Sequence, residues 1–187
     1  MNKLLAFLIF TIITLSSCDG RDRKHKNNKE VLIEHNLLDS FSERIRYIPE
    51  TYSEIETDTL LSNGFRVNIK TYTEMQDNVF NEFIIDSIKY KFYYRNYTGK
   101  LNIFYNNTAV LKETINKSYL NKNDEKVFWD DAIMAGISID ENNSSEKEVF
   151  INVLYCIPES EICKEFKIIV DNKGNTTLKE LDSEPIH

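Results

Sequence analysis

Residues 55–72, IETDTLLSNGFRVNIKTY, decide the fold class of this chain. Asn63-Gly64 separates two short runs, and apolar and polar residues alternate through the second run from Phe65 to Thr71. An Asn-Gly pair between alternating runs is a strong hairpin signal, because both residues tolerate positive φ. Successive side chains of a strand point to opposite faces of its sheet. The stretch therefore predicts an antiparallel β-hairpin with one apolar face.

The same alternation recurs along most of the chain. Further strands are predicted at residues 83–97, 101–105, 109–115, 149–155, 166–170 and 176–181. Thr98-Gly99-Lys100 is predicted to turn the chain between the first two of these strands. Alternation of this kind is typical of antiparallel sheets that leave one face in water. The predicted fold class is mainly β, an antiparallel sheet or sandwich with one or two short helices, and an α+β fold is the alternative.

Two segments favour helices. Apolar residues at spacings of three and four predict a helix over residues 31–48, which Pro49 would end. These apolar residues are Leu38, Phe41, Ile45 and Ile48. Residues 124–134 form the second predicted helix, and residues 133–139 fit a strand equally well.

The N-terminal residues have the layout of an export signal. Lys3 is followed by an apolar run over residues 4–13, and Leu15-Ser16-Ser17-Cys18 closes the segment. A membrane-spanning helix needs roughly 20 apolar residues, so this run is too short to span stably. Residues 1–17 are therefore predicted to be a signal peptide.

The tetrapeptide Leu15-Ser16-Ser17-Cys18 resembles the lipobox of bacterial lipoproteins. The resemblance implies that Cys18 becomes the first mature residue and carries acyl chains such as palmitate. Two or more chains, at ~0.8 kcal/mol per buried methylene, anchor a protein almost permanently. The implied location is the cell envelope, outside the cytoplasm and lipid-anchored to a bacterial membrane. An ordinary signal peptide with an incidental cysteine, or a short buried helix, is the alternative.

The rest of the chain is predicted to comprise a tether and one domain. Residues 19–30, DGRDRKHKNNKE, contain no large apolar residue, so residues 18–30 are predicted to form a lipidated, flexible tether. Residues 31–187 are long enough to bury a core and are predicted to form a single β-rich domain. This domain resembles the short bacterial envelope lipoproteins of unknown function.

The net charge of the chain limits the classes of molecule that it is predicted to bind. The leader contains one basic residue, Lys3, so the remaining chain has 22 basic and 30 acidic residues and a net charge of −8. Such a chain is repelled by nucleic acid and by anionic lipid faces. The membrane, reached through Cys18, and another envelope protein or a glycan are the predicted partners; nucleic acid is not.

Cys156 and Cys163 remain as an even pair of thiols between two predicted strands. In an oxidising compartment this pair predicts a disulfide, and two free thiols are the alternative. Zinc is disfavoured because His25, His35 and His187 are scattered and no second Cys or His pair lies nearby. No metal and no cofactor are predicted.

Patterns typical of catalysis are missing from the sequence. It contains no glycine-rich phosphate loop, no H-E-x-x-H and no G-x-S-x-G. We therefore predict no catalytic residue and a non-catalytic binding or interaction domain. The alternatives are an immunity or inhibitor protein that masks a basic partner, and a glycan hydrolase with a carboxylate-only site.

Residues 89–97, KYKFYYRNY, contain the candidate ligand-binding residues. Alternation places Tyr90, Phe92 and Tyr94 on a core face and five residues on the opposite, wet face. These five are Lys89, Lys91, Tyr93, Arg95 and Tyr97. Tyr93, Arg95 and Tyr97 are predicted to stack on a sugar ring, a base or an aromatic side chain of a peptide, and net charge and compartment disfavour nucleic acid. Routine cross-strand pairing on a wet sheet face is the alternative.

Overall fold

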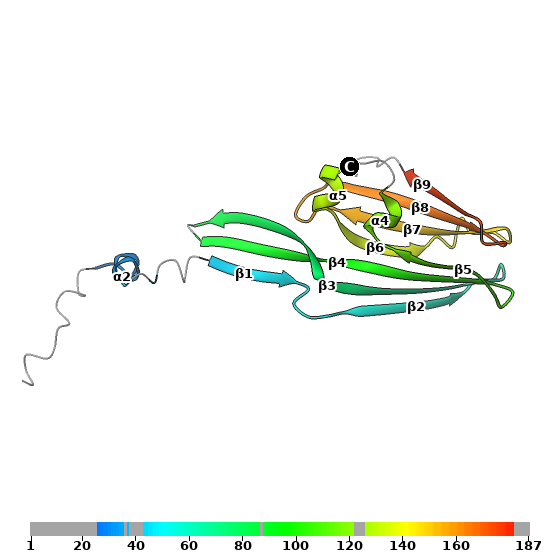
Figure 1. Ribbon diagram of the computed structural model, residues 1–187, viewed down its shortest axis with the longest axis horizontal. Coiled ribbons are helices and arrows are strands. Elements are labelled where there is room, and N and C mark those ends of the chain that lie inside the picture. The colour runs from blue at the N-terminus through cyan, green and yellow to red at the C-terminus, as the bar shows by residue number, and fades with distance from the viewer. Residues whose placement is uncertain (1–25, 36, 38–42, 87, 122–125, 182–187) are drawn as a thin grey trace, which may run out of the picture. The chain divides into compact units, whose positions relative to one another are not determined.

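The computed structural model of the chain (Figure 1) describes residues 26–35, 37, 43–86, 88–121 and 126–181. The predicted signal peptide, residues 1–17, and Cys18 lie outside the described residues. Contacts divide the described chain into two compact units. One comprises residues up to 44 together with 84–89, and the other comprises residues 45–83 and 90 onwards.

The first unit contains helix α2, Asn28–Glu34. Its N-terminus carries a capping box, because Asn27 Oδ1 accepts from the Glu30 backbone N–H and Glu30 Oε2 accepts from the Asn27 backbone N–H. No residue of this helix is buried. Helical structure therefore begins within the segment predicted as a flexible tether.

The helix predicted over residues 31–48 is wrong in its second half. Strand β1, Glu43–Ile48, occupies that half, and all six of its residues are exposed. Ile45 and Tyr47 alternate with Arg44 and Arg46, so the segment also carries a period of two. The pairing of β1 with a distant strand decides between the two periods, since tertiary contacts override local preference.

The first sheet contains five strands and is mixed. Its order is β1-β4-β3-β2, and β5 pairs with the second half of β4. The strands added to β1 are β2 (Glu54–Leu60), β3 (Phe65–Ile85), β4 (Ile88–Tyr105) and β5 (Thr108–Ile115). The hairpin predicted at Asn63-Gly64 joins β2 to β3, and Gly64 takes φ +91° there.

The turn predicted at Thr98-Gly99-Lys100 is wrong, because β4 runs through these residues without a break. Gly99 pairs with Ile115 of β5. A Cβ at Gly99 would lie 3.4 Å from Ile137 Cδ1, at the edge of ordinary contact. This glycine therefore lets the strand approach its neighbours closely and does not reverse the chain.

The second sheet is antiparallel, in the order β6-β7-β8-β9. Its strands are β6 (Ile133–Ile139), β7 (Glu148–Cys156), β8 (Cys163–Asp171) and β9 (Thr176–Leu181). Two short helices, α4 (Lys117–Leu120) and α5 (Lys126–Asp131), connect β5 to β6 and so lead the chain from the first sheet to the second (Figure 1). Residues 133–139 therefore form a strand.

The two sheets enclose one apolar core, which confirms the predicted mainly β architecture. The inward side chains of the first sheet include Phe65, Val67, Leu101 and Ile103, all 0% exposed. Those of the second sheet include Val149, Ile151, Val153, Tyr155, Ile168 and Val170, which are also 0% exposed. Trp129 of α5 closes one end, with its ring 5.1 Å from Tyr155 and 5.4 Å from Phe166.

A glycine fixes a contact between the sheets at their other end. Gly174, in the turn from β8 to β9, has φ +88°. A Cβ there would lie 2.2 Å from the backbone oxygen of Val110 in β5. The turn therefore lies directly against the opposite sheet, and no side chain fits between them.

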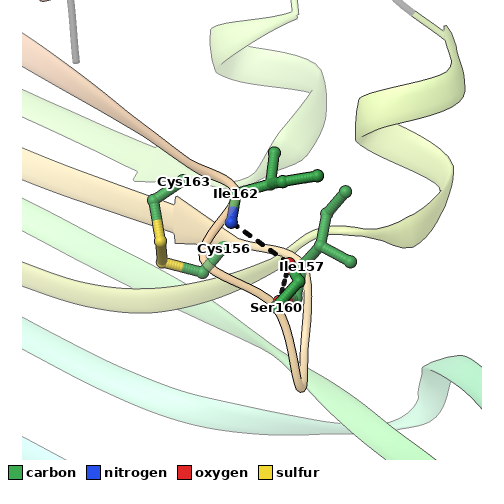
Figure 2. The surroundings of a disulfide bond; sticks show 5 residues. All are labelled: Cys156, Ile157, Ser160, Ile162 and Cys163. Carbon is green, nitrogen blue, oxygen red and sulfur yellow. Dashed lines mark hydrogen bonds between the residues drawn. A yellow bond between two sulfur atoms is a disulfide. The ribbon is translucent and has the colours of Figure 1, made fainter. Parts of the chain in front are cut away.

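The predicted disulfide between Cys156 and Cys163 is present and closes the β7–β8 hairpin (Figure 2). The two cysteines face each other as the last residue pair of the two strands. Ser160 orders the connecting turn, because its Oγ donates to Ile157 O (2.9 Å) and accepts from Ile162 N (3.2 Å). A disulfide of this kind is typical of proteins that fold outside the cytoplasm.

Replacing both Cys156 and Cys163 by alanine is expected to lower the free energy of unfolding by about 2–3 kcal/mol, because a short closed loop is no longer constrained in the unfolded chain. Urea denaturation of the wild type and the double variant measures the difference. A reductant is the control: it should destabilise the wild type by a similar amount and leave the variant unchanged. Equal stabilities without reductant would contradict the prediction.

Candidate functional site

Five side chains on β1, β3 and β4 form a surface that we call the aromatic face: Tyr47, Met75, Phe80, Tyr93 and Arg95. Tyr93 is central, because its ring stacks on Tyr47 at 4.9 Å and meets Phe80 at 5.1 Å. All five residues belong to the second unit. Tyr47 of β1 therefore joins a ring cluster whose other members, Phe80 and Tyr93, come from the consecutive strands β3 and β4.

Arg95 lies beneath this surface and is 9% exposed. Its Cζ lies 4.9 Å from the centre of the Tyr47 ring, a cation–π contact. Its Nη1 donates to the Met75 backbone oxygen (2.9 Å) and lies 3.0 Å from Met75 Sδ. Its Nε is buried and has no acceptor within the described part of the chain.

No carboxylate of the described residues forms an ion pair with Arg95. Burying a charge without an opposite charge is costly. The aromatic face therefore contains an unbalanced cation next to exposed rings.

The outer part of the aromatic face is open to solvent. Phe80 is 49% exposed, Tyr47 is 41% exposed and Met75 is 38% exposed. Tyrosine, phenylalanine, methionine and arginine are the residue types enriched at protein–protein interfaces, where lysine and acidic residues are depleted. The composition of this surface is thus that of an interface.

A second ring cluster uses the other side chains of the same strands. Phe83 stacks on Tyr90 at 5.3 Å and meets Phe92 edge-on at 5.1 Å, and Phe92 meets Tyr94 at 6.0 Å. Tyr94 is buried and its hydroxyl donates to Glu159 Oε1 (2.7 Å). Burial, together with this hydrogen bond, raises the pKa of Tyr94, so the phenol stays protonated.

The face of β4 that was predicted to lie in the core is therefore only partly buried. Tyr90, Phe92 and Tyr94 do contact one another, but Tyr90 and Phe92 are half-buried against Phe83 and only Tyr94 is buried. This cluster is packed within the chain.

The structure separates the three predicted binding residues. Tyr93 and Arg95 both contact Tyr47, whereas Tyr97 is half-buried and packs against the core between the sheets. Tyr97 also lines an apolar pocket of about 330 Å³ between β2 and β6. The predicted wet face is wrong, because Arg95 is buried and Tyr97 contacts the core.

The alternation fails because β4 is covered on both sides near its middle. Tyr94, Arg95 and Asn96 are consecutive, and all three are buried. Tyr94 reaches Glu159 of the β7–β8 turn, and Arg95 reaches Tyr47 of β1. Alternation of apolar and polar residues marks a strand with one face in the core, so it does not predict the burial of a strand that packs on both faces.

Sequence reasoning missed Tyr47 and Phe80. Tyr47 lies in the segment predicted as a helix, and Phe80 lies in a part of β3 for which no strand was predicted. Residues 79–82 carry no period-two signal, because Val79 and Phe80 are both apolar and Asn81 and Glu82 are both polar. No local signal links Tyr47 to Tyr93 either.

No His, Cys, Asp and Glu side chains of the described residues group in threes in a way that could hold a metal ion. His25 and His187 lie outside the described residues. Within the described part of the chain, no helix has the length and apolar character needed to cross a bilayer.

No protein-family model matches this chain, and no curated protein matches it at a significant level. Its function must therefore be inferred from its own residues.

Proposed function

We propose that this protein is a lipid-anchored binding protein of the bacterial envelope and that it engages a second envelope protein through the aromatic face. Cys18 carries the acyl chains, and no chemical reaction is catalysed. The partner approaches Tyr47, Phe80 and Tyr93, and it supplies an acidic group for Arg95.

The disulfide and the leader support the location. Cys156 and Cys163 are bridged, which is typical of oxidising compartments. The segment Leu15-Ser16-Ser17-Cys18 resembles a lipobox, which favours attachment to a membrane through the cysteine.

Arg95 is the single observation that carries the binding role. It is 9% exposed, its Nε has no acceptor, and no acid among the described residues balances its charge. Charged pairs at interfaces give specificity and orientation, and their effect grows where water is excluded. The exposed rings beside Arg95 supply the apolar area that excludes this water.

A protein partner is favoured over a glycan at this surface. Tyr47 and Phe80 both contact the ring of Tyr93, so the rings already pack within the chain and are not spread to receive a flat sugar ring. Exposed ring edges beside a methionine and an arginine instead match the core of a protein interface.

Site-specific photo-crosslinking in living cells tests the proposal. A photoreactive phenylalanine analogue at Phe80 is expected to give a discrete adduct with one envelope protein, identified by mass spectrometry. The same analogue at Leu60 is the matched control, because Leu60 is 74% exposed and pairs with Arg66 at the opposite end of β3. The absence of a discrete adduct at Phe80, or identical adducts at both positions, would contradict the proposal.

A further inference from the structure

A second, polar pocket lies where β3 and β4 meet the junction of β5 and α4, and it has a volume of about 320 Å³. Its polar lining includes Glu74, Asp77, Asn96, Thr98 and Lys117. All of these residues belong to the second unit. The pocket shares only Tyr97 with the residues predicted to bind a ligand.

Asn96 presents an unused acceptor in this pocket. Its side chain is almost fully buried, at 3% exposure, and its Nδ2 donates to Asp77 Oδ2 over 2.7 Å. Because Asp77 requires a donor, the amide orientation is fixed and Oδ1 is the remaining acceptor. That Oδ1 is buried and has no partner. Buried acceptors are almost always paired, so this one has the capacity to accept from a water molecule or from a bound ligand.

Lys117 presents an unused donor. Its side chain is half-buried and forms no hydrogen bond or ion pair with the described residues. Burial lowers its pKa, whereas the charges of Asp77, Asp130 and Asp131 act in the opposite direction. The ammonium group therefore lacks an acceptor at a place where water is partly excluded.

The charges of the lining restrict the class of ligand. Glu74 and Asp77 repel an anion such as a phosphate or a carboxylate, and Lys117 repels an ammonium group. A hydroxyl group both donates and accepts, so a molecule with several hydroxyls can donate to Asn96 and accept from Lys117. A neutral molecule with several hydroxyl groups is thus the ligand that this lining fits.

We propose that this pocket binds one neutral sugar ring, with one hydroxyl donating to Asn96 Oδ1 and another accepting from Lys117 Nζ. Small-molecule sites occupy about 300–1,000 Å³, so this pocket, at the small end of the range, accommodates a single ring. The proposal does not depend on the protein partner of the aromatic face.

Saturation-transfer NMR on the detergent-solubilised full-length protein tests this inference. The probes are glucose, galactose, mannose and N-acetylglucosamine. At least one of them is expected to show saturable signal transfer with the wild type. Inorganic phosphate and ethanolamine, as anionic and cationic probes, are expected not to compete with the sugar.

Lys117→Met is the informative variant, because the side chain of Lys117 has no hydrogen-bond partner among the described residues and the protein should remain folded. It is expected to weaken sugar binding about tenfold or more, as for the loss of one charge-assisted hydrogen bond. Lys112→Met is the matched control on exposed β5, outside the pocket lining, and should bind like the wild type.

Three results would overturn the proposal: no saturable transfer from any of the four sugars to the wild type, equal binding by the Lys117→Met and Lys112→Met variants, or displacement of the sugar by phosphate or ethanolamine. The first result needs no variant, so a substitution that unfolds the protein leaves the test intact.

Discussion

Replacing Cys18 by serine is expected to move the protein from the membrane fraction to the soluble envelope fraction. The serine hydroxyl cannot form the thioether, so no diacylglycerol is attached. Each acyl chain contributes ~0.8 kcal/mol per buried methylene, so the loss of the anchor lowers membrane affinity by many orders of magnitude. Fractionation followed by immunoblotting measures the shift, and labelled palmitate measures the acylation directly.

Ser17→Ala is the matched control for this variant, because it keeps a small residue before the cysteine and leaves Cys18 in place. It is expected to remain in the membrane fraction and to take up the label. A Cys18→Ser protein that stays with the membranes and takes up as much label as the wild type would rule out the lipid anchor.

Replacing Arg95 by methionine is expected to abolish the crosslink at Phe80 while leaving the fold intact. The methionine keeps an apolar chain against Tyr47 but removes the buried charge that no acid balances. Losing one partner of a buried charge pair costs an interface about 2–5 kcal/mol. The isolated protein should be no less stable, because an unpaired buried charge is itself unfavourable. Crosslinking yield and Tm measure the two effects.

Arg46→Met is the control for the effect of removing an arginine. Arg46 is on the neighbouring β1, is 63% exposed and lies 3.9 Å from Glu50 in a surface ion pair. Such pairs contribute little, so both Tm and crosslinking should stay near the wild-type values. If Arg95→Met lowered Tm sharply and kept the crosslink, Arg95 would be a structural residue and the binding proposal would fail.

Local signals were sufficient for the hairpins. Asn63-Gly64 marks the β2–β3 turn because its backbone needs a positive φ. Residues 149–155 and 166–170 alternate because each strand has one face on the core and one in water. Where a strand has one face in the core and ends in a tight turn, its own residues are sufficient to predict it, and contacts with distant segments are not needed.

The role of Gly99 and the strand β1 are two features that local sequence patterns did not predict. A glycine is common both in turns and at close approaches between strands, and only the neighbour Ile137 distinguishes the two roles here. The residues of β1 fit two periods, and the choice depends on β4, more than 40 positions away. Contacts between residues so far apart along the chain produce no hydrophobic period that can be read from the local sequence.

The candidate site was predicted only in part for the same reason. Tyr93 and Arg95 are two positions apart on one strand, so alternation placed them together. Tyr97 was added by the same rule, but the strand is covered on both faces before that position. Tyr47 and the orphaned amide oxygen of Asn96 became visible only with the fold.

Gly174 offers a fingerprint for recognising distant homologues. Two features exclude alanine at this position: the positive φ of the backbone and the closeness of the Val110 backbone oxygen. Across evolution, a protein that retains this sandwich should therefore keep a glycine at the same surface turn even where flanking loops diverge. The preceding hairpin contains a cysteine pair seven positions apart. The glycine and this cysteine pair together give a sequence pattern for finding distant homologues whose overall sequence identity is low.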